Sequence, residues 1–166
     1  RDELEVLLEC MHLLERHPNS EEIRPVLLGL MRAKEESIRV RAINLIGKRE
    51  NPDDFPVLQR HILTRNIGMT HQESLAVGAS MSKVDAAASM ALFEDWLRPK
   101  GILKRMRPVQ KGQDVAAIGG LENLDFEEAD ELLKILAKRA GGAIYELCMN
   151  ARTRRRRRIQ EGRGNE

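Results

Sequence analysis

Five consecutive cationic side chains near the C-terminal end form the group with the plainest chemistry: Arg154, Arg155, Arg156, Arg157 and Arg158. Clustered guanidinium groups neutralise phosphates, which gives salt-dependent, sequence-independent binding to nucleic acid. The same charges also suit an acidic protein or an acidic membrane surface, or they simply keep a helix end in water. Tyr145 is the nearest aromatic residue, so the run lacks the rings on which unpaired bases stack.

A second basic stretch, residues 98–112, contains six cations and no acidic residue. Its prolines prevent one continuous helix. Long irregular connections in compact folds are often functional, and this one could grip phosphates, acidic lipid or an acidic protein face. Alternatively, its apolar residues cover a groove between helices while its cations stay in water. The candidate partner contacts in this stretch are Lys100, Lys104, Arg105 and Arg107.

The remaining chemical combinations have poor spacing for catalysis or metal binding. His12 and His17 are five residues apart, so they diverge around a helix and do not form a metal site with Cys10. His71 lies near Ser74, but no acid is placed to orient its imidazole. We therefore expect no catalytic residue, no metal site and no cofactor.

The composition indicates a chain of helices. Aromatic residues make up only 3%, and the apolar content is carried by Leu, Ile, Val, Ala and Met, which favour a helical core over a sheet. Charged residues make up 33%, and no apolar run is as long as a membrane span requires. Two cysteines without partner spacing suit a reducing cytosol. Because the chain starts at Arg1 without a signal segment, we expect a fragment of a longer cytoplasmic protein.

Apolar residues recur at helical spacing in short segments that are separated by turns. One domain is predicted over 1–151, followed over 152–166 by an Arg-rich helix end and a disordered tail. Asp85 is placed to begin a new helix, and the basic stretch 98–112 interrupts the series as an insertion. The predicted helices span 2–17, 21–34, 37–49, 55–66, 71–82, 86–98 and 113–121, with a further helix that ends at Gly141-Gly142 and a last one from Ala143.

One sequence phrase recurs along this helical series. It reads Ile38-Arg39-x-x-Ala42-x-x-Leu45-Ile46-Gly47, then a polar turn and an acidic residue, and worn copies lie near 71–85, 111–125 and 143–151. The helix before it also has a copy, because Phe55-Pro56-Val57-Leu58 repeats Ile23-Arg24-Pro25-Val26-Leu27 at an offset of 31 to 32. Such self-similarity is typical of stacked helical repeats, in which each unit buries its apolar face on its neighbours.

The phrase, with the proline-containing helix before it and Asp53 or Asp54 after it, resembles the HEAT repeat family, particularly its short bacterial form. The resemblance covers roughly residues 20–151. It implies an all-α fold, namely an α-solenoid of antiparallel helix pairs with about four repeats. It also implies that Arg39 contacts the acid of an adjacent loop, Asp53 or Asp54.

Arg41, Asn44 and Lys48 fall on one side of the helix predicted over 37–49, opposite its apolar face. Curved solenoids present such inner-helix faces to their ligands, so these residues are candidate partner contacts. The alternative is an ordinary solvated face.

In the next unit the equivalent positions are Ser74, Val77 and Met81. An exposed Val77 and Met81 would extend the surface as an apolar patch, whereas a buried pair would belong to the core.

Together these observations predict an interaction module and not an enzyme. The expected role is a protein–protein interaction or scaffold module of a larger protein, which binds another protein or a tethered domain through the inner-helix face and the basic loop. The first alternative is a nucleic-acid-binding HEAT-like protein that uses the Arg-rich segments. The second is an enzyme, because the HEAT resemblance extends to bilin-attaching lyases.

Overall fold

The computed structural model describes residues 3–17, 20–65, 68–98 and 111–163, and within these ranges all regular secondary structure is helical. The prediction of an all-α chain is therefore confirmed for the described residues. The helices are α1 (Glu3–Arg16), α2 (Ile23–Leu30), α3 (Glu36–Lys48), the short 3₁₀ helix η1 (Pro52–Asp54), α4 (Phe55–Thr64), α5 (His71–Val84), α6 (Ala86–Leu97), α8 (Lys111–Asn123), α9 (Glu127–Arg139) and α10 (Gly142–Arg163).

The starts of α5 and α6 follow from single polar side chains. The hydroxyl oxygen of Thr70 accepts a hydrogen bond from the backbone N–H of Glu73 at 3.1 Å, and the Asp85 carboxylate accepts one from Ala88 at 2.9 Å. Each bond satisfies one of the backbone donors that a helix start leaves without an intrahelical partner. The predicted role of Asp85 is thereby confirmed.

Helix α2 is shorter than the predicted 21–34, since it ends at Leu30. Part of the reason is the Arg39 guanidinium, whose Nη1 donates to the carbonyl oxygens of Ala33 at 3.0 Å and Lys34 at 2.6 Å. These carbonyls accept from a side chain of the following helix, so the segment turns instead of continuing α2.

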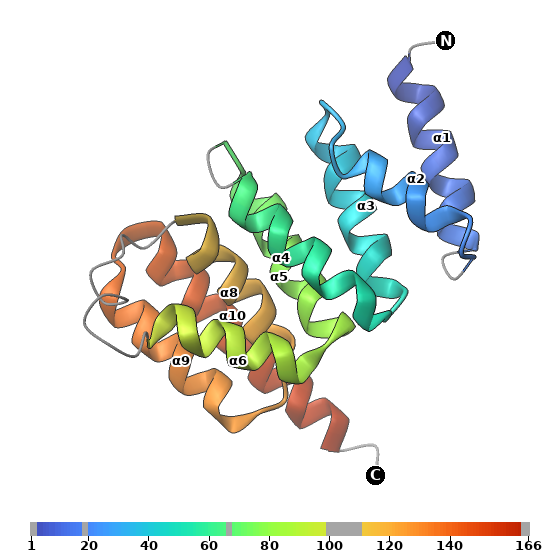
Figure 1. The fold of residues 1–166 in the computed structure, drawn as a ribbon. Coiled ribbons are helices and arrows are strands. Elements are labelled where there is room, and N and C mark those ends of the chain that lie inside the picture. The colour runs from blue at the N-terminus through green and yellow to red at the C-terminus, as the bar shows by residue number, and fades with distance from the viewer. Residues whose placement is uncertain (1–2, 18–19, 66–67, 99–110, 164–166) are drawn as a thin grey trace.

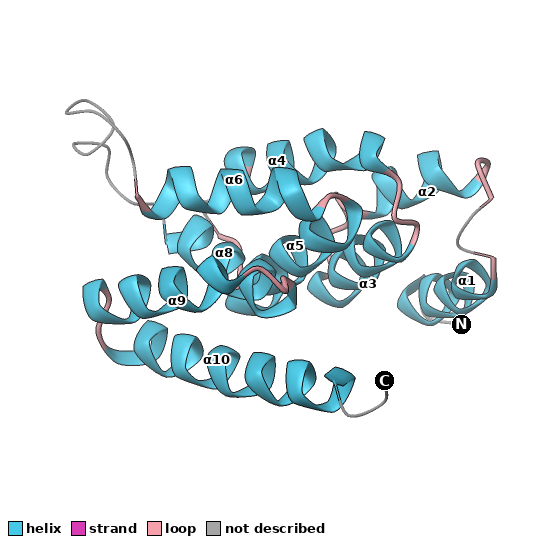
Figure 2. Ribbon diagram, turned by 90° about the horizontal axis from the view of Figure 1, so that it is seen from below, coloured by secondary structure: helices cyan, strands magenta, loops and turns pink. Residues whose placement is uncertain are grey.

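The helices lie in rows (Figures 1 and 2). Helices α2, α4 and α6 form one row, and α3, α5 and α8 form a second row beside it, with contacts between α2 and α3, α4 and α5, and α6 and α8. Helices α9 and α10 pack near the α8 end of the second row, while α1 contacts α3 at the opposite end. Helix α5 has neighbours in both rows, and nine of its residues are buried.

Helices α5 and α8 touch through their backbones. A Cβ atom placed on Gly78 would lie 1.7 Å from the carbonyl oxygen of Ala116, and one on Gly119 would lie 2.3 Å from that of Leu75. On the other side of α8, a Cβ on Gly120 would lie 2.1 Å from the Phe93 ring. Only glycine permits this approach, because every other residue carries a Cβ atom into occupied space.

Helices α3 and α5 pack side by side and run in the same direction. Arg39 near the start of α3 contacts Glu73 near the start of α5, and further along the Ser80 hydroxyl donates to the carbonyl oxygen of Ile43 at 2.9 Å. The absence of a side chain on Gly47 makes room for Ser80, since a Cβ there would lie 2.6 Å from the Ser80 hydroxyl oxygen. The register between the two helices is therefore an offset of about 35 residues.

Candidate functional site

The predicted contacts on α3 lie where the helix faces solvent, although not equally. Asn44 and Lys48 are exposed, and Arg41 is half-buried. Among the described residues, Arg41 Nη1 has no hydrogen-bond acceptor and is shielded from solvent. Asn44 and Lys48 are thus directly accessible to a partner, whereas Arg41 is partly covered.

The continuation of this face onto α5 differs from the prediction. Ser74, Val77 and Met81 are buried, so Val77 and Met81 belong to the core and form no apolar patch. The offset of about 35 between α3 and α5 instead aligns Ala79 with Asn44 and Lys83 with Lys48, and of this pair on α5 Lys83 is exposed. The predicted equivalent positions on α5 lie two residues before the positions that the packing aligns with α3. Sequence similarity alone did not fix which side of α5 meets α3.

We call the solvent-facing set on these two helices the α3–α5 stripe. It consists of Arg41, Asn44, Lys48, Ala79 and Lys83. Its three charged members are all cations, and no described residue forms an ion pair with Lys48 or Lys83. The stripe is therefore a narrow cationic surface beside an otherwise buried helix.

The basic stretch predicted over 98–112 is narrower than expected at its C-terminal end, because Lys111 and Gly112 already belong to α8. Lys100, Lys104, Arg105 and Arg107 lie outside the described residues. Arg98 is the residue that follows the last turn of α6, and its backbone N–H donates to the carbonyl oxygen of Glu94 at 2.7 Å.

The C-terminal arginines belong to a well-formed helix. Helix α10 runs from Gly142 to Arg163, so the predicted boundary between residues 151 and 152 falls inside it. The Arg154 guanidinium donates to both carboxylate oxygens of Glu122, at 2.6 and 2.8 Å. Such bidentate pairs fix the geometry as well as the charge.

Arg155 corrects one predicted phosphate contact. Its side chain is turned inward and only 5% of the residue is exposed. Its Nε donates to the carbonyl oxygen of Leu124 at 2.9 Å and its Nη2 to that of Phe126 at 2.6 Å. Burial lowers the pKa of this guanidinium from its usual value. Arg155 therefore joins α10 to the turn between α8 and α9 and is not available to a surface ligand.

The other arginines of the run also have partners in the chain. Asp130 accepts from Arg152 at 2.9 Å and from Arg156 at 3.3 Å, and these contacts, that of Arg152 first, lower the pKa of the Asp130 carboxyl to about 2. Arg157 pairs with Glu161 at 2.8 Å, and Arg158 with Asp125 at 2.6 Å. A phosphate would have to compete with these carboxylates.

An open pocket of about 640 Å³ lies where α10 meets the start of α9. Its lining combines opposite charges, with Asp125, Glu127 and Asp130 facing Arg155, Arg156 and Arg158. Because Asp125 and Asp130 already pair with arginines of α10, the pocket offers neither a free acid–base pair nor a uniform charge for one class of ligand.

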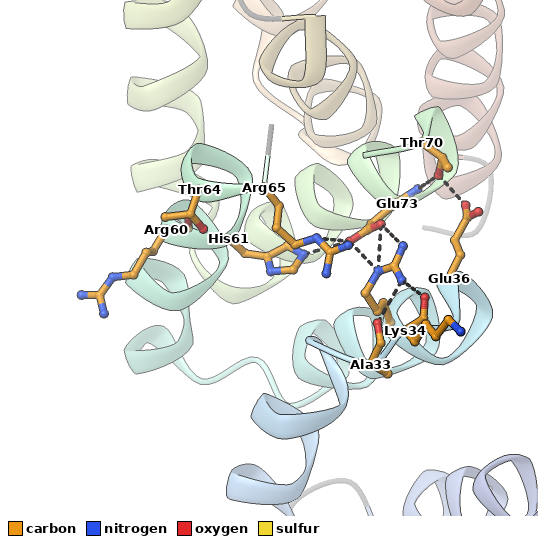
Figure 3. Close-up of polar contacts among 10 residues, drawn as sticks. Ala33, Lys34, Glu36, Arg60, His61, Thr64, Arg65, Thr70 and Glu73 are labelled. Carbon is orange, nitrogen blue, oxygen red and sulfur yellow. Dashed lines mark hydrogen bonds and ion pairs between the residues drawn. The ribbon is translucent and has the colours of Figure 1, made fainter. Parts of the chain in front are cut away.

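A buried charge cluster joins α3, α4 and α5, and sequence analysis did not predict it (Figure 3). The Glu73 carboxylate is fully buried and accepts from Arg39 Nη2 at 2.8 Å, with Arg39 Nε 3.1 Å from both of its oxygens. His61 Nε2 lies 3.0 Å from the same carboxylate, and Arg65 Nε lies at 3.9 Å. One carboxylate thus accepts from residues of two neighbouring helices.

The prediction that Arg39 contacts Asp53 or Asp54 is therefore wrong. Arg39 binds Glu73, whereas Asp54 is buried and accepts from Arg24 Nε at 2.7 Å, with Arg49 Nε at 3.7 Å. The arginine of the repeated phrase therefore reaches forward to α5 and not to the loop that follows its own helix. The only sequence signal for this pair is a glutamate near the start of α5.

The pKa values of Glu73 and His61 in the charge cluster are both below their usual values. Burial alone would raise the pKa of Glu73, but hydrogen bonds from Arg39 and His61 outweigh it and hold this pKa below its usual value. Burial is also the main influence on His61 and lowers its pKa, because the imidazolium is poorly solvated, although Glu73 acts in the opposite direction. Both groups are buried, and their contacts join α3, α4 and α5.

The described residues contain no cluster of three or more His, Cys, Asp or Glu side chains that could hold a metal ion. Burial raises the pKa of the Cys148 thiol to about 11, which makes it a poor nucleophile, while Cys10 is exposed. Among the described helices, none combines the length and the apolar character that crossing a membrane requires.

Comparison with protein-family models, curated proteins and solved structures finds no match to this chain.

Proposed function

We propose that this chain is a HEAT-like α-solenoid of about four antiparallel helix pairs and that it works as a protein-interaction module of a larger cytoplasmic protein. The two rows of helices support this arrangement, because α2, α4 and α6 lie beside α3, α5 and α8 in the same order (Figure 2). The parallel packing of α3 and α5 at a steady offset also fits stacked units.

The observation that carries the function is the α3–α5 stripe. Helix α5 is buried almost all round, yet the same side of α3 and α5 leaves Lys48 and Lys83 in solvent. Two lysines on neighbouring helices without an ion-pair partner among the described residues suit an acidic segment of another protein. The contribution of Lys100, Lys104, Arg105 and Arg107 to the same partner rests on the sequence.

Nucleic-acid binding through α10 has less support. Arg154, Arg156, Arg157 and Arg158 each already pair with a carboxylate, and Arg155 is buried. Counterion release by a phosphate chain would have to exceed the loss of these pairs. The lyase alternative likewise lacks a supporting observation, since Asp125 and Asp130 of the pocket between α9 and α10 are held by arginines.

The test reverses the charge of the stripe. The chain is immobilised and the proteins that it retains from cell extract are quantified for the wild type and for the double variant Lys48→Glu/Lys83→Glu. We expect a set of acidic proteins whose retention falls roughly ten-fold in the double variant, because like charges then face each other.

Arg60→Glu is the matched control. Arg60 is exposed on α4 and its side chain points away from the charge cluster (Figure 3). The Arg60→Glu variant should therefore retain the same proteins as the wild type. Equal retention by the wild type and the stripe variant would remove the α3–α5 stripe from the proposed function.

A further inference from the structure

The two halves of α10 are held to the molecule by different contacts. In the first half Cys148 and Ala151 are buried in the hydrophobic core. From residue 152 to residue 162 the only buried side chain is that of Arg155, which donates to backbone carbonyl oxygens. The second half of α10, at the edge of the molecule, is therefore held mainly by arginines (Figure 2).

These arginines contact one acidic segment between α8 and α9. We call residues 122–130 the acidic turn, because it contains five acidic residues: Glu122, Asp125, Glu127, Glu128 and Asp130. Its contacts are Arg154 with both oxygens of Glu122, Arg158 with Asp125, and Arg152 and Arg156 with Asp130. Four arginines of α10 are thus occupied by carboxylates of a single short segment.

The ion pairs leave the guanidinium groups close to solvent. The side chains of Arg154, Arg156 and Arg158 are 55%, 58% and 44% exposed. Ion pairs at such exposure are weak and are screened by salt. A phosphate group binds the same fork of N–H donors that a carboxylate occupies. These side chains can therefore exchange a carboxylate for a phosphate while the buried Arg155 keeps α10 in place.

The arginines flank the buried side of α10 in two rows. At about 100° per residue, Arg152 and Arg156 lie on one side of the buried Arg155. Arg154 and Arg158 lie on its other side. A single row of phosphates reaches one flank, whereas the two strands that border a duplex groove reach both.

A groove of suitable size exists in duplex DNA. The major groove of B-form DNA, about 12 Å wide, admits an α-helix. Residues 152–163 include no aromatic residue, so this half of α10 lacks the rings on which unpaired bases stack. The arrangement of the cations therefore favours duplex DNA over a single strand.

We propose that the Arg-rich half of α10 binds the phosphates of duplex DNA and that the acidic turn is a built-in competitor that lowers this affinity. In the resting chain Glu122, Asp125 and Asp130 occupy the guanidinium donors. The phosphates of the two strands displace these carboxylates, which return to solvent. This autoinhibitory contact goes beyond the protein-interaction role and does not use the α3–α5 stripe, so either proposal can fail without the other.

The first experiment removes part of the competitor. Binding of a short fluorescein-labelled DNA duplex is measured by fluorescence anisotropy, at several salt concentrations, for the 166-residue chain and for Glu122→Gln/Asp125→Asn. The amides keep the shape of the acids and release Arg154 and Arg158. We expect the double variant to bind about ten-fold more tightly, with a steeper salt dependence, because the freed arginines neutralise phosphates without giving up a carboxylate. An unchanged affinity would contradict the proposal.

Glu127→Gln/Glu128→Gln is the matched control. It removes two negative charges from the same acidic turn, and among the described residues neither glutamate forms an ion pair with an arginine. The affinity for the duplex should change by less than about two-fold, because distant exposed charges are screened. A gain as large as that of Glu122→Gln/Asp125→Asn would show that net charge alone matters, and it would overturn the competitor role.

Two further measurements identify the arginines and the ligand. Adding Arg154→Gln/Arg158→Gln to the Glu122→Gln/Asp125→Asn chain should remove the gain in affinity and leave the helical circular dichroism signal unchanged, since both arginines are largely exposed. Single-stranded DNA and poly-glutamate of equal charge should compete at least several-fold less well than unlabelled duplex. Equal competition by either one, or a gain that persists without Arg154 and Arg158, would overturn the proposal.

Discussion

Helix α5 is joined to its two neighbours in the second row by opposite means. Toward α3 the joint is made by polar side chains, with Glu73 held by Arg39 and with Ser80 donating to the Ile43 carbonyl, while His61 of α4 adds a contact to Glu73. Toward α8 it is made by missing side chains, since Gly78 and Gly119 bring two backbones together. The first joint is directional and depends on protonation, whereas the second depends on shape alone.

This difference assigns separate roles to the two joints. The Arg39–Glu73 pair ties the start of α3 to the start of α5, so it sets the register that aligns Lys48 with Lys83. The glycine contact sets how closely the C-terminal group of helices approaches. A change in the first joint should alter the α3–α5 stripe, and a change in the second should separate the two halves of the chain.

The largest effect is expected at the glycine joint. Gly78→Ala places a methyl group 1.7 Å from the Ala116 carbonyl oxygen, where the obstacle is backbone and cannot rotate away. We expect a loss of about 5 kcal/mol or more in the free energy of unfolding, measured by urea denaturation followed by circular dichroism.

Gly29→Ala is the control for that change, because nothing lies within 4 Å of the added methyl group. It should stabilise the chain by about 0.5–1 kcal/mol through helix propensity. Similar free energies for the two variants would show that the α5–α8 contact is looser than described.

The next effect is expected at the polar joint. Glu73→Ala leaves the Arg39 guanidinium buried without its carboxylate, and removing one partner of a buried ion pair costs about 3–5 kcal/mol. The same denaturation measurement should show this loss. Replacing Arg39 and Glu73 together by Met and Leu should recover much of it, because the orphaned charge is then gone. A double variant as unstable as Glu73→Ala would argue against a paired charge.

The smallest effect is expected from a change of pH and needs no substitution. Of the two joints, only the polar joint contains titratable side chains, so only this joint responds to acid. The folded pKa of His61 lies below 6.5, so the unfolded chain takes up this proton first and stability falls as pH decreases from 6.5. The folded pKa of Glu73 lies below 4.5, so the stability present above pH 4.5 is lost as pH falls through the folded value.

Urea denaturation at a series of pH values measures this dependence. The free energy of unfolding should decrease from pH 7 to pH 4 and beyond, and the decrease should be smaller in His61→Asn/Glu73→Gln, which removes both titrating groups. Gly29→Ala should keep the wild-type slope. An identical slope in the double variant would show that acid acts elsewhere.

The sequence predicted the helices well where local signals decide them. Asp85 begins α6 because a carboxylate can cap the amide three residues on, and the apolar spacing of α1 is contained in its own residues. The sequence failed at α2, which ends at Leu30, and the carbonyl oxygens of Ala33 and Lys34 just beyond its end accept from Arg39 of the next helix. The candidate site was predicted in part, since Lys48 is exposed but the continuation at Lys83 required the packing of α3 against α5.

What the sequence by itself determined is the succession of helices and the excess of cations at two places, because helical periodicity and charge are properties of neighbouring residues. Only the tertiary structure decided which charges are paired. Arg39 and Glu73 are 34 residues apart, and Arg155 reaches a carbonyl oxygen 31 residues earlier in the chain. Burial strengthens such contacts and fixes their partners, and burial arises only when distant helices pack together.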